Sequence, residues 1–106
     1  MRRPVITCVN NVYVAMFGDM NIVFTERSWE AQEIAKEMGS KQEPYWWTQS
    51  FTLNDANHDA LFAFLNEMER KLGRGYISEF VQIRGYDVNR PWKEVEILVS
   101  GFVFCL

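Results

Sequence analysis

The sequence has 106 residues, 48% hydrophobic and 24% charged, and this balance is typical of one folded domain with a single core and not of a disordered chain. The net charge is −3 with scattered Lys and Arg residues, which argues against nucleic-acid binding and is far too small for an acidic mimic of nucleic acid. Trp, Tyr and Phe make up 15% of the chain, more than one small core needs, so we expect some rings to face a partner.

The first quarter of the chain, Val5 to Glu26, is rich in β-branched and aromatic residues and predicts strands. Turn chemistry interrupts it at Asn10-Asn11 and at residues 18–21. Between these breaks, residues 12–17 are apolar on both alternating faces, which indicates a strand covered on each side or one at an interface. Residues 22–25 are expected to pair back as a hairpin.

A helix is predicted from Ser28, as N-cap, to Met38, because Ala31, Ile34, Ala35 and Met38 have the spacing of one apolar stripe. Gly39 provides the stop signal.

Residues 45–51 then predict a strand that carries two adjacent tryptophans. Tyr45, Trp47 and Phe51 fall on one side of such a strand, and Trp46 falls on the other side with two small polar residues, Thr48 and Ser50. This polar company marks Trp46 as the exposed ring.

A second, longer helix is expected to begin between Thr52 and Asn57 and to end at Gly73, with Thr52 and Asp55 at capping-box spacing. Its core stripe consists of Leu61, Phe64, Leu65, Met68 and Leu72.

Two strands are predicted after this helix, Tyr76–Ile83 and Trp92–Leu106, joined through a loop over residues 85–91. The end of the last strand is apolar on both sides, and Gly101 within it indicates a bulge or a close backbone approach.

The order of elements, β-β-α-β-α-β-β, predicts an α+β fold. We expect an antiparallel or mixed sheet of about five strands, with the two helices packed on one face. A doubly wound nucleotide-binding sheet is disfavoured, because regular strand-helix alternation and a glycine-rich first turn are both missing from the sequence.

The beginning of the sequence does not have the pattern of a signal peptide, and no run approaches the ~18 to 20 apolar residues that span a bilayer. We therefore expect a cytoplasmic protein that does not bind membranes. Cys8 and Cys105 lie in apolar strand-like runs and are predicted to be small buried hydrophobes in a reducing compartment.

No catalytic, metal or cofactor site is predicted. The single histidine, His58, has only Cys8 and Cys105 as thiol partners, and both are expected to be buried and unreactive. The metal-ligand spacings CxxC and HxxxH, an EF-hand loop and a glycine-rich phosphate loop are all missing from the sequence. Close carboxylate pairs, such as Glu94 with Glu96, fall on faces that are predicted to be solvated.

Two groups of residues are the candidates for contacts with other proteins. Arg, Tyr and Trp, which are enriched at binding hot spots, gather in and beside the loop after the predicted strand Tyr76–Ile83. Trp46, with Trp47 beside it, forms the second candidate patch. The predicted partner-binding residues are Trp46, Arg84, Tyr86, Asp87, Arg90 and Trp92. The two-sided apolar end of the chain adds a predicted oligomer interface of Phe102, Phe104 and Leu106, which could extend the sheet across a homodimer.

The composition is similar to that of many small accessory proteins of bacteria and their phages, and no motif singles out a family. We expect a non-catalytic protein-binding module, such as an inhibitor or regulator that docks on a larger protein. The alternatives are a small-molecule-binding domain or small enzyme with an aromatic pocket, and a homo-oligomeric structural subunit.

Overall fold

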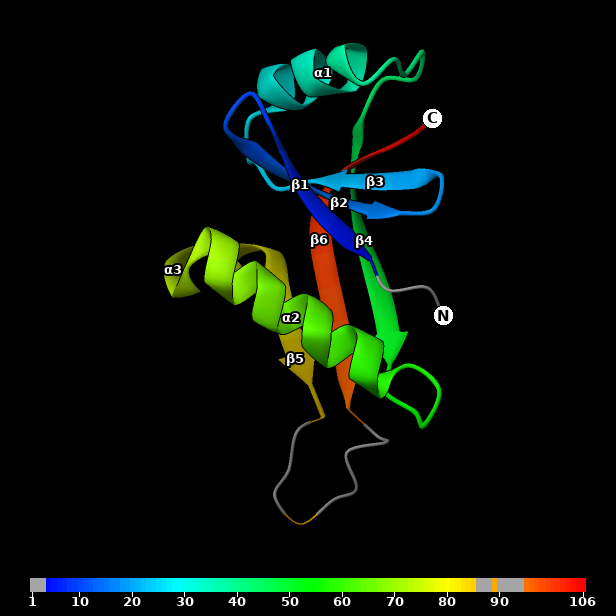
Figure 1. Cartoon of the computed structure of the whole chain (residues 1–106), viewed down its shortest axis with the longest axis vertical. Helices are drawn as coiled ribbons and strands as arrows, with labels where there is room; N and C mark the ends of the chain where they lie inside the picture. The colour runs from blue at the N-terminus through cyan, green and yellow to red at the C-terminus, as the bar shows by residue number, and fades with distance from the viewer. Residues whose placement is uncertain (1–3, 86–88, 90–94) are drawn as a thin grey trace.

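The computed structural model describes residues 4–85, 89 and 95–106 as an antiparallel six-stranded sheet with three helices (Figure 1). The predicted α+β class is confirmed. The elements in chain order are β1 (Val5–Val9), β2 (Val12–Phe17), β3 (Met20–Val23), α1 (Ser28–Glu37), β4 (Tyr45–Thr52), α2 (His58–Leu72), α3 (Arg74–Phe80), β5 (Val81–Arg84) and β6 (Glu96–Cys105).

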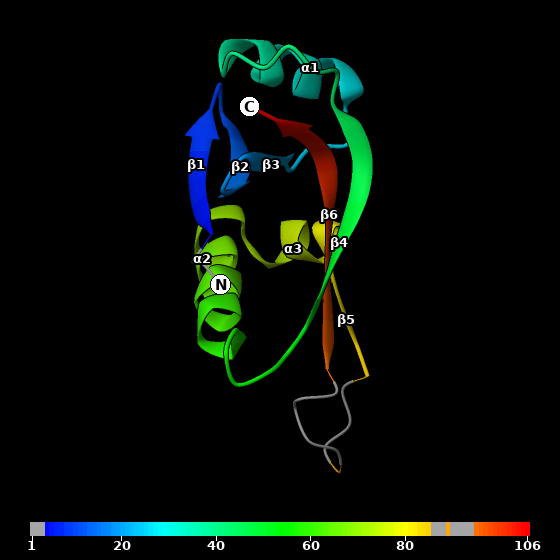
Figure 2. The same cartoon turned by 90° about the vertical axis from the view of Figure 1, so that its right-hand side faces the viewer.

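The long strand β6 organises the sheet, whose order is β1-β2-β3-β6-β4 with β5 also on β6. On one side β4 pairs along β6 from Val103 to Glu96. On the other side β3 pairs with the end of β6 and β5 pairs with its beginning. The sheet therefore bends where β3 replaces β5, with β1 to β3 on one side of the bend and β4 and β6 on the other (Figure 2).

Gly101 lies where this change of partner occurs. A Cβ atom added to it would lie 2.5 Å from Ile22 Cγ2 and 2.7 Å from the Val23 carbonyl oxygen, both on β3. The predicted close backbone approach at Gly101 is confirmed, because only a residue without a side chain allows β3 this near to β6.

The helices cover both faces of the sheet. Successive residues of one strand supply two different cores: Val103 belongs to the cluster beneath α2 and α3, and Phe104 to the cluster beneath α1. Because successive side chains of a strand point to opposite faces, α1 lies on the face opposite to α2 and α3. The two helices that share a face are thus α2 and α3.

The predicted core stripe of α2 is confirmed, with Leu61, Phe64 and Met68 fully buried and Leu65 and Leu72 packed at the margin. The helix ends at Gly73 as expected. Its beginning is fixed differently from the expected capping box, since the backbone N–H groups of Ala56 and Asn57 donate to Asn54 Oδ1.

The beginning of α1 also differs from the prediction. The N-cap position is Arg27, and Ser28 is the first residue of the helix. The Thr25 hydroxyl accepts a hydrogen bond from the Arg27 N–H at 3.2 Å and donates one to Glu30 Oε1 at 2.5 Å. Thr25 therefore ties the chain to the first helical turn.

The prediction of a strand over Tyr76–Ile83 is wrong in its first part, because the chain forms α3 up to Phe80 and the strand β5 only afterwards. The buried Phe80 ring packs on Phe24 with their centroids 5.5 Å apart. So short a helix depends on tertiary packing, which local sequence does not encode. The last predicted strand begins within the described residues at Glu96.

Both predicted turns near the beginning of the chain are present. Asn10 and Asn11 have φ angles of +50° and +67°, the left-handed pair that a two-residue hairpin of type I′ requires, and asparagine tolerates this conformation. The first turn therefore makes β1 a separate strand, which brings the sheet to six strands.

No helix in the described part of the chain has the length and apolar character to cross a bilayer.

Candidate protein-binding surface

The strand β4 forms one edge of the sheet, since its only partner among the described strands is β6. It has eight residues, and its sequence YWWTQSFT contains no charged residue and no proline. An edge strand that is long, uncharged and rich in β-forming residues is an open template for pairing with another chain.

Three adjacent aromatic side chains of β4 are exposed to about half of their full extent: Tyr45 at 49%, Trp46 at 47% and Trp47 at 50%. Tyr45 and Trp47 lie on one face of β4 with their ring centroids 6.0 Å apart. Trp46 lies on the other face and contacts the ring of Phe102 edge-on at 5.3 Å. Each ring is thus held against a neighbour while half of it faces solvent.

The backbone of β4 also has groups that do not bond to β6. The N–H of Leu53 donates to the carbonyl of Val95 at 2.9 Å, so the odd-numbered residues of this ladder bond to β6. The N–H and C=O groups of Trp46, Thr48 and Ser50 consequently point away from β6, along the open edge, where the Ser50 carbonyl accepts a hydrogen bond from Gln49 Nε2 at 3.5 Å. We call these backbone groups and the rings of Tyr45, Trp46 and Trp47 the β4 surface.

The other edge of the main sheet, β1, is blocked by a charged side chain. Lys71 of α2 donates from Nζ to the Ile6 carbonyl at 2.9 Å. Glu67 lies 3.3 Å from the same Nζ and accepts hydrogen bonds from Arg70, which lower the pKa of the Glu67 carboxyl. A helix side chain that occupies a carbonyl of an edge strand hinders pairing of this edge with another chain.

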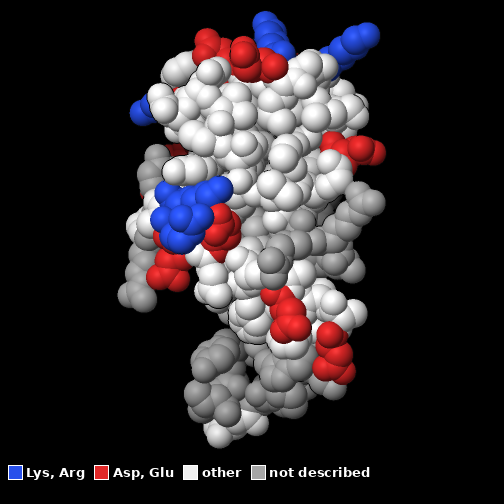
Figure 3. All heavy atoms as spheres, in the orientation of Figure 1, with Lys and Arg blue, Asp and Glu red and all other residues white. Residues whose placement is uncertain are grey.

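The short strand β5 is protected by its length and charge, because it has only four residues and ends in the exposed Arg84. Charged side chains also gather over α1 and near the C-terminal end of α2 (Figure 3). Compared with the edges at β1 and β5, β4 is the edge without a charged side chain.

Two of the predicted partner-binding residues lie within the described part of the chain. Trp46 is on the β4 surface, as expected. Arg84 pairs with Glu96, six positions along β6 from Phe102, which pairs with Trp46. Six positions of a strand span roughly 20 Å, so the structure does not bring Trp46 and Arg84 together. Tyr86, Asp87, Arg90 and Trp92 lie outside the described residues.

The three residues of the predicted oligomer interface have different surroundings. Leu106 is 60% exposed and Phe102 is half-buried beside Trp46, but Phe104 is fully buried in the cluster beneath α1. The last strand is apolar on both sides because α1 covers one face and the other face belongs to the cluster beneath α2 and α3. Phe104 is therefore a core residue.

The sequence indicated Trp47 only as the neighbour of Trp46 in a candidate patch and did not indicate Tyr45, and it placed both residues on the side away from the exposed ring. The side itself is correct, since both residues share a face with Phe51. Their exposure follows from the position of β4 at the edge, where the cores beneath the helices do not reach the end of the strand. The one signal in the sequence is the uncharged run from Tyr45 to Thr52.

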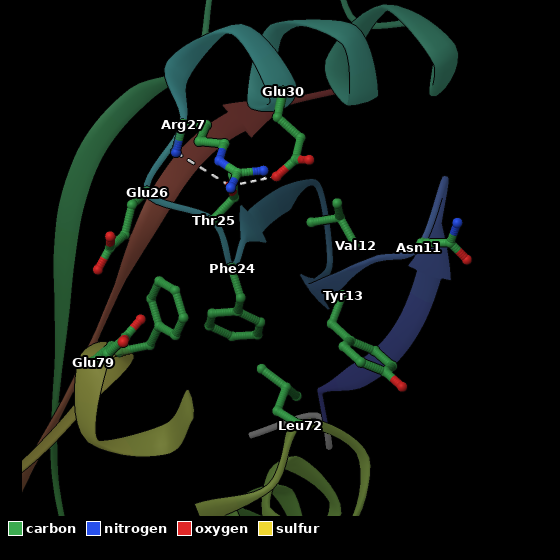
Figure 4. A pocket seen from close by; sticks show the side chains of 11 residues that line it. Asn11, Val12, Tyr13, Phe24, Thr25, Glu26, Arg27, Glu30, Leu72 and Glu79 are labelled. Atoms are coloured by element: carbon green, nitrogen blue, oxygen red, sulfur yellow. Dashed lines mark hydrogen bonds between the residues drawn. The ribbon is translucent and has the colours of Figure 1, made fainter. Parts of the chain in front are cut away.

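A pocket of about 400 Å³ opens beside α1, on the side of β2 and α3 (Figure 4). Phe24 and Phe80, both buried, provide its apolar lining. Three carboxylates and one guanidinium stand around it, those of Glu26, Glu30, Glu79 and Arg27. The described lining of the pocket thus combines apolar rings with polar groups and carries an excess of negative charge.

Cys8 and Cys105 are free and exposed, so the prediction that both are buried is wrong. They lie at the margins of the sheet, where the cores do not cover them. Within residues 4–85, 89 and 95–106, no three His, Cys, Asp or Glu side chains are grouped so that they could hold a metal ion. Comparison of the chain with protein-family models, curated proteins and solved structures gave no match.

Proposed function

We propose that this chain is a non-catalytic protein-binding module, an inhibitor or regulator that docks on a larger protein through the β4 surface. The observation that carries the proposal is the row of three half-exposed aromatic residues on an uncharged edge strand. Trp and Tyr are the residues most enriched at binding hot spots, and rings already held by neighbours lose little side-chain entropy when a partner covers them.

The exposed rings can account for a stable complex. A tryptophan buries 150–250 Å² when fully covered, so the exposed half of one ring leaves roughly 100 Å² for a partner. Covering that area contributes about 2.5 kcal/mol at ~25 cal/mol per Å². Two tryptophans therefore supply a contribution of hot-spot size.

Arg84 fits this proposal as a peripheral contact. A standard interface covers about 800 Å² on each partner, a patch roughly 30 Å across, and such a patch centred on β4 reaches the end of β5. A charge at the rim of an interface changes the association rate and its salt dependence more than the affinity.

The test is capture of a partner from the lysate of the source cells by immobilised wild type and by a W46A/W47A variant. We expect the variant to lose at least 10-fold of the captured partner, since removing 1.4 kcal/mol already changes an affinity by that factor. The matched control is Trp29→Ala, which removes a 56% exposed tryptophan from α1 and leaves the β4 surface intact. Circular dichroism confirms that all three proteins fold.

The outcome that contradicts the proposal is equal capture by the wild type, the Trp29 variant and the double variant. Loss of the partner in the Trp29 variant alone would move the binding surface to α1.

The pocket beside α1 supports a second candidate function, the binding of a small ligand. Its size is within the range of ligand sites, and two buried rings beside a surplus of carboxylates favour an organic cation such as a protonated arylalkyl amine. We expect arylalkyl amines to raise the melting temperature by a few degrees and the matching arylalkyl carboxylates to leave it unchanged.

The variant Glu79→Gln is expected to reduce this shift, whereas Glu37→Gln, on α1 and outside the pocket lining, serves as the control. Equal shifts with amines and carboxylates would exclude recognition of the charge.

A further inference from the structure

We infer that the edge of β4 pairs with the same edge of a second copy of this chain, antiparallel and about a two-fold axis at Thr48. The inference rests on the proposed function in that both use the β4 surface, and it deepens that function by naming what occupies the backbone edge. The two sheets then continue into each other, and the rings remain on the two faces of the joined sheet.

The outward backbone groups of β4 lie on both sides of Thr48. Trp46, Thr48 and Ser50 point their N–H and C=O groups outward, as derived above from the Leu53–Val95 hydrogen bond. At the far end, the carbonyl of Thr52 accepts a hydrogen bond from Asn57 Nδ2 at 2.9 Å. The chain therefore closes its own edge after Ser50, and the open groups centre on Thr48.

The sequence of β4 is complementary to itself about Thr48. An antiparallel two-fold through Thr48 places Thr48 opposite its own copy and Trp46 opposite Ser50 of the second copy. On the other face it places Trp47 opposite Gln49 of the second copy. Each tryptophan thus meets a smaller side chain, and threonines paired across strands are favourable.

The distribution of charge also favours pairing through β4. Each copy has a net charge of −3, so any face on which acidic residues gather would resist self-association. No charged residue lies within β4, so no like charges face each other across the paired strands. The remaining edges are closed by Lys71 and by Arg84, which leaves β4 as the edge that a second copy can join.

Pairing also builds a larger aromatic surface. On the face that carries Tyr45 and Trp47, Phe51 and Gln49 of the second copy lie beside these two rings. The two-fold axis produces the same group of four side chains a second time. A dimer therefore presents two such groups on one continuous sheet, which gives a larger protein a broader docking surface than one copy offers.

The experiment uses disulfide trapping in a background without native thiols, C8S/C105S, because both native cysteines are exposed. Thr48→Cys places two thiols opposite each other, at the Cα separation of about 5.5 Å of a hydrogen-bonded pair, which a disulfide can bridge. The matched control, Thr52→Cys, is exposed on the same edge. In the proposed dimer its two copies lie eight positions apart, roughly 27 Å, too far to bridge.

The result expected under mild oxidation is a covalent dimer that forms at least 10-fold faster for Thr48→Cys than for Thr52→Cys, together with a dimer of the reduced C8S/C105S protein by light scattering. Any other pattern overturns the inference: equal rates indicate random collision, and no trapping with a monomeric protein excludes pairing. Circular dichroism of each variant shows whether the fold is retained.

The two proposals can fail separately. A protein that stays monomeric and still loses its partner in W46A/W47A overturns the dimer and keeps the binding module. Specific trapping through Thr48 with equal partner capture by W46A/W47A keeps the dimer and overturns the docking function.

Discussion

Gly101→Ala is expected to lower the free energy of unfolding by about 3 kcal/mol, at the upper end of the usual cost of overpacking. The new methyl group would meet Ile22 Cγ2 at 2.5 Å and the Val23 carbonyl oxygen at 2.7 Å. Side-chain adjustment can relieve the first contact, but the second involves backbone, so β3 must move away from β6. Urea denaturation followed by circular dichroism measures the effect.

Gly75→Ala is the matched control, because nothing lies within 4 Å of a Cβ atom at Gly75 and its φ angle is not positive. Alanine is favoured over glycine in helices, so this change in α3 should leave stability unchanged or raise it by up to about 1 kcal/mol. If both variants were equally stable, the close approach of β3 to β6 at Gly101 would not exist in solution.

The close approach at Gly101 also shows which features of the fold can be predicted from the sequence. A glycine inside an apolar strand is a local signal, and it predicted the close approach correctly. The hairpin turn at Asn10 and Asn11 and the apolar stripe of α2 are local signals of the same kind, and both predictions are confirmed. The helix α3 has no such signal, because its conformation depends on the packing of Phe80 on Phe24, which lies in the segment directly after β3.

The position of β4 at the edge is not a local property either. Its sequence resembles that of a strand with one buried face, and the rings of Tyr45 and Trp47 are exposed where β4 has no further neighbour among the described strands. The sequence therefore predicted the exposure of Trp46 but not that of its two neighbours. The candidate surface follows from topology, and topology depends on how β6 distributes its partners.

The end of β6 illustrates the opposite error. Apolar residues on both faces of a strand are typical of an interface or of a strand covered on both sides, and sequence cannot separate these cases. In the folded chain, Phe104 is buried beneath α1, and Val103 on the other face is buried in the cluster beneath α2 and α3. The predicted interface residue Phe104 therefore contributes to stability.

Phe104→Ala is accordingly expected to lower the free energy of unfolding by about 3–5 kcal/mol, the range for removing a buried phenylalanine. The side chain is fully buried among Val14, Val23 and Ile34, and alanine leaves a cavity between the sheet and α1. A domain of this size has a total stability of roughly 5–15 kcal/mol, so the variant loses a large part of it. Thermal unfolding should show a fall of more than 10 °C.

Two further variants separate a core role of Phe104 from an interface role. Phe104→Leu keeps most of the apolar volume and should cost less than half as much as alanine, so it yields a folded sample even where alanine does not. Leu106→Ala changes a side chain that is 60% exposed and should stay within about 0.5 kcal/mol of the wild type. If Phe104 lay at a subunit contact, Phe104→Leu would instead change the oligomeric state measured by light scattering. The position of Phe104 beneath α1 predicts that Phe104→Leu keeps the oligomeric state of the wild type.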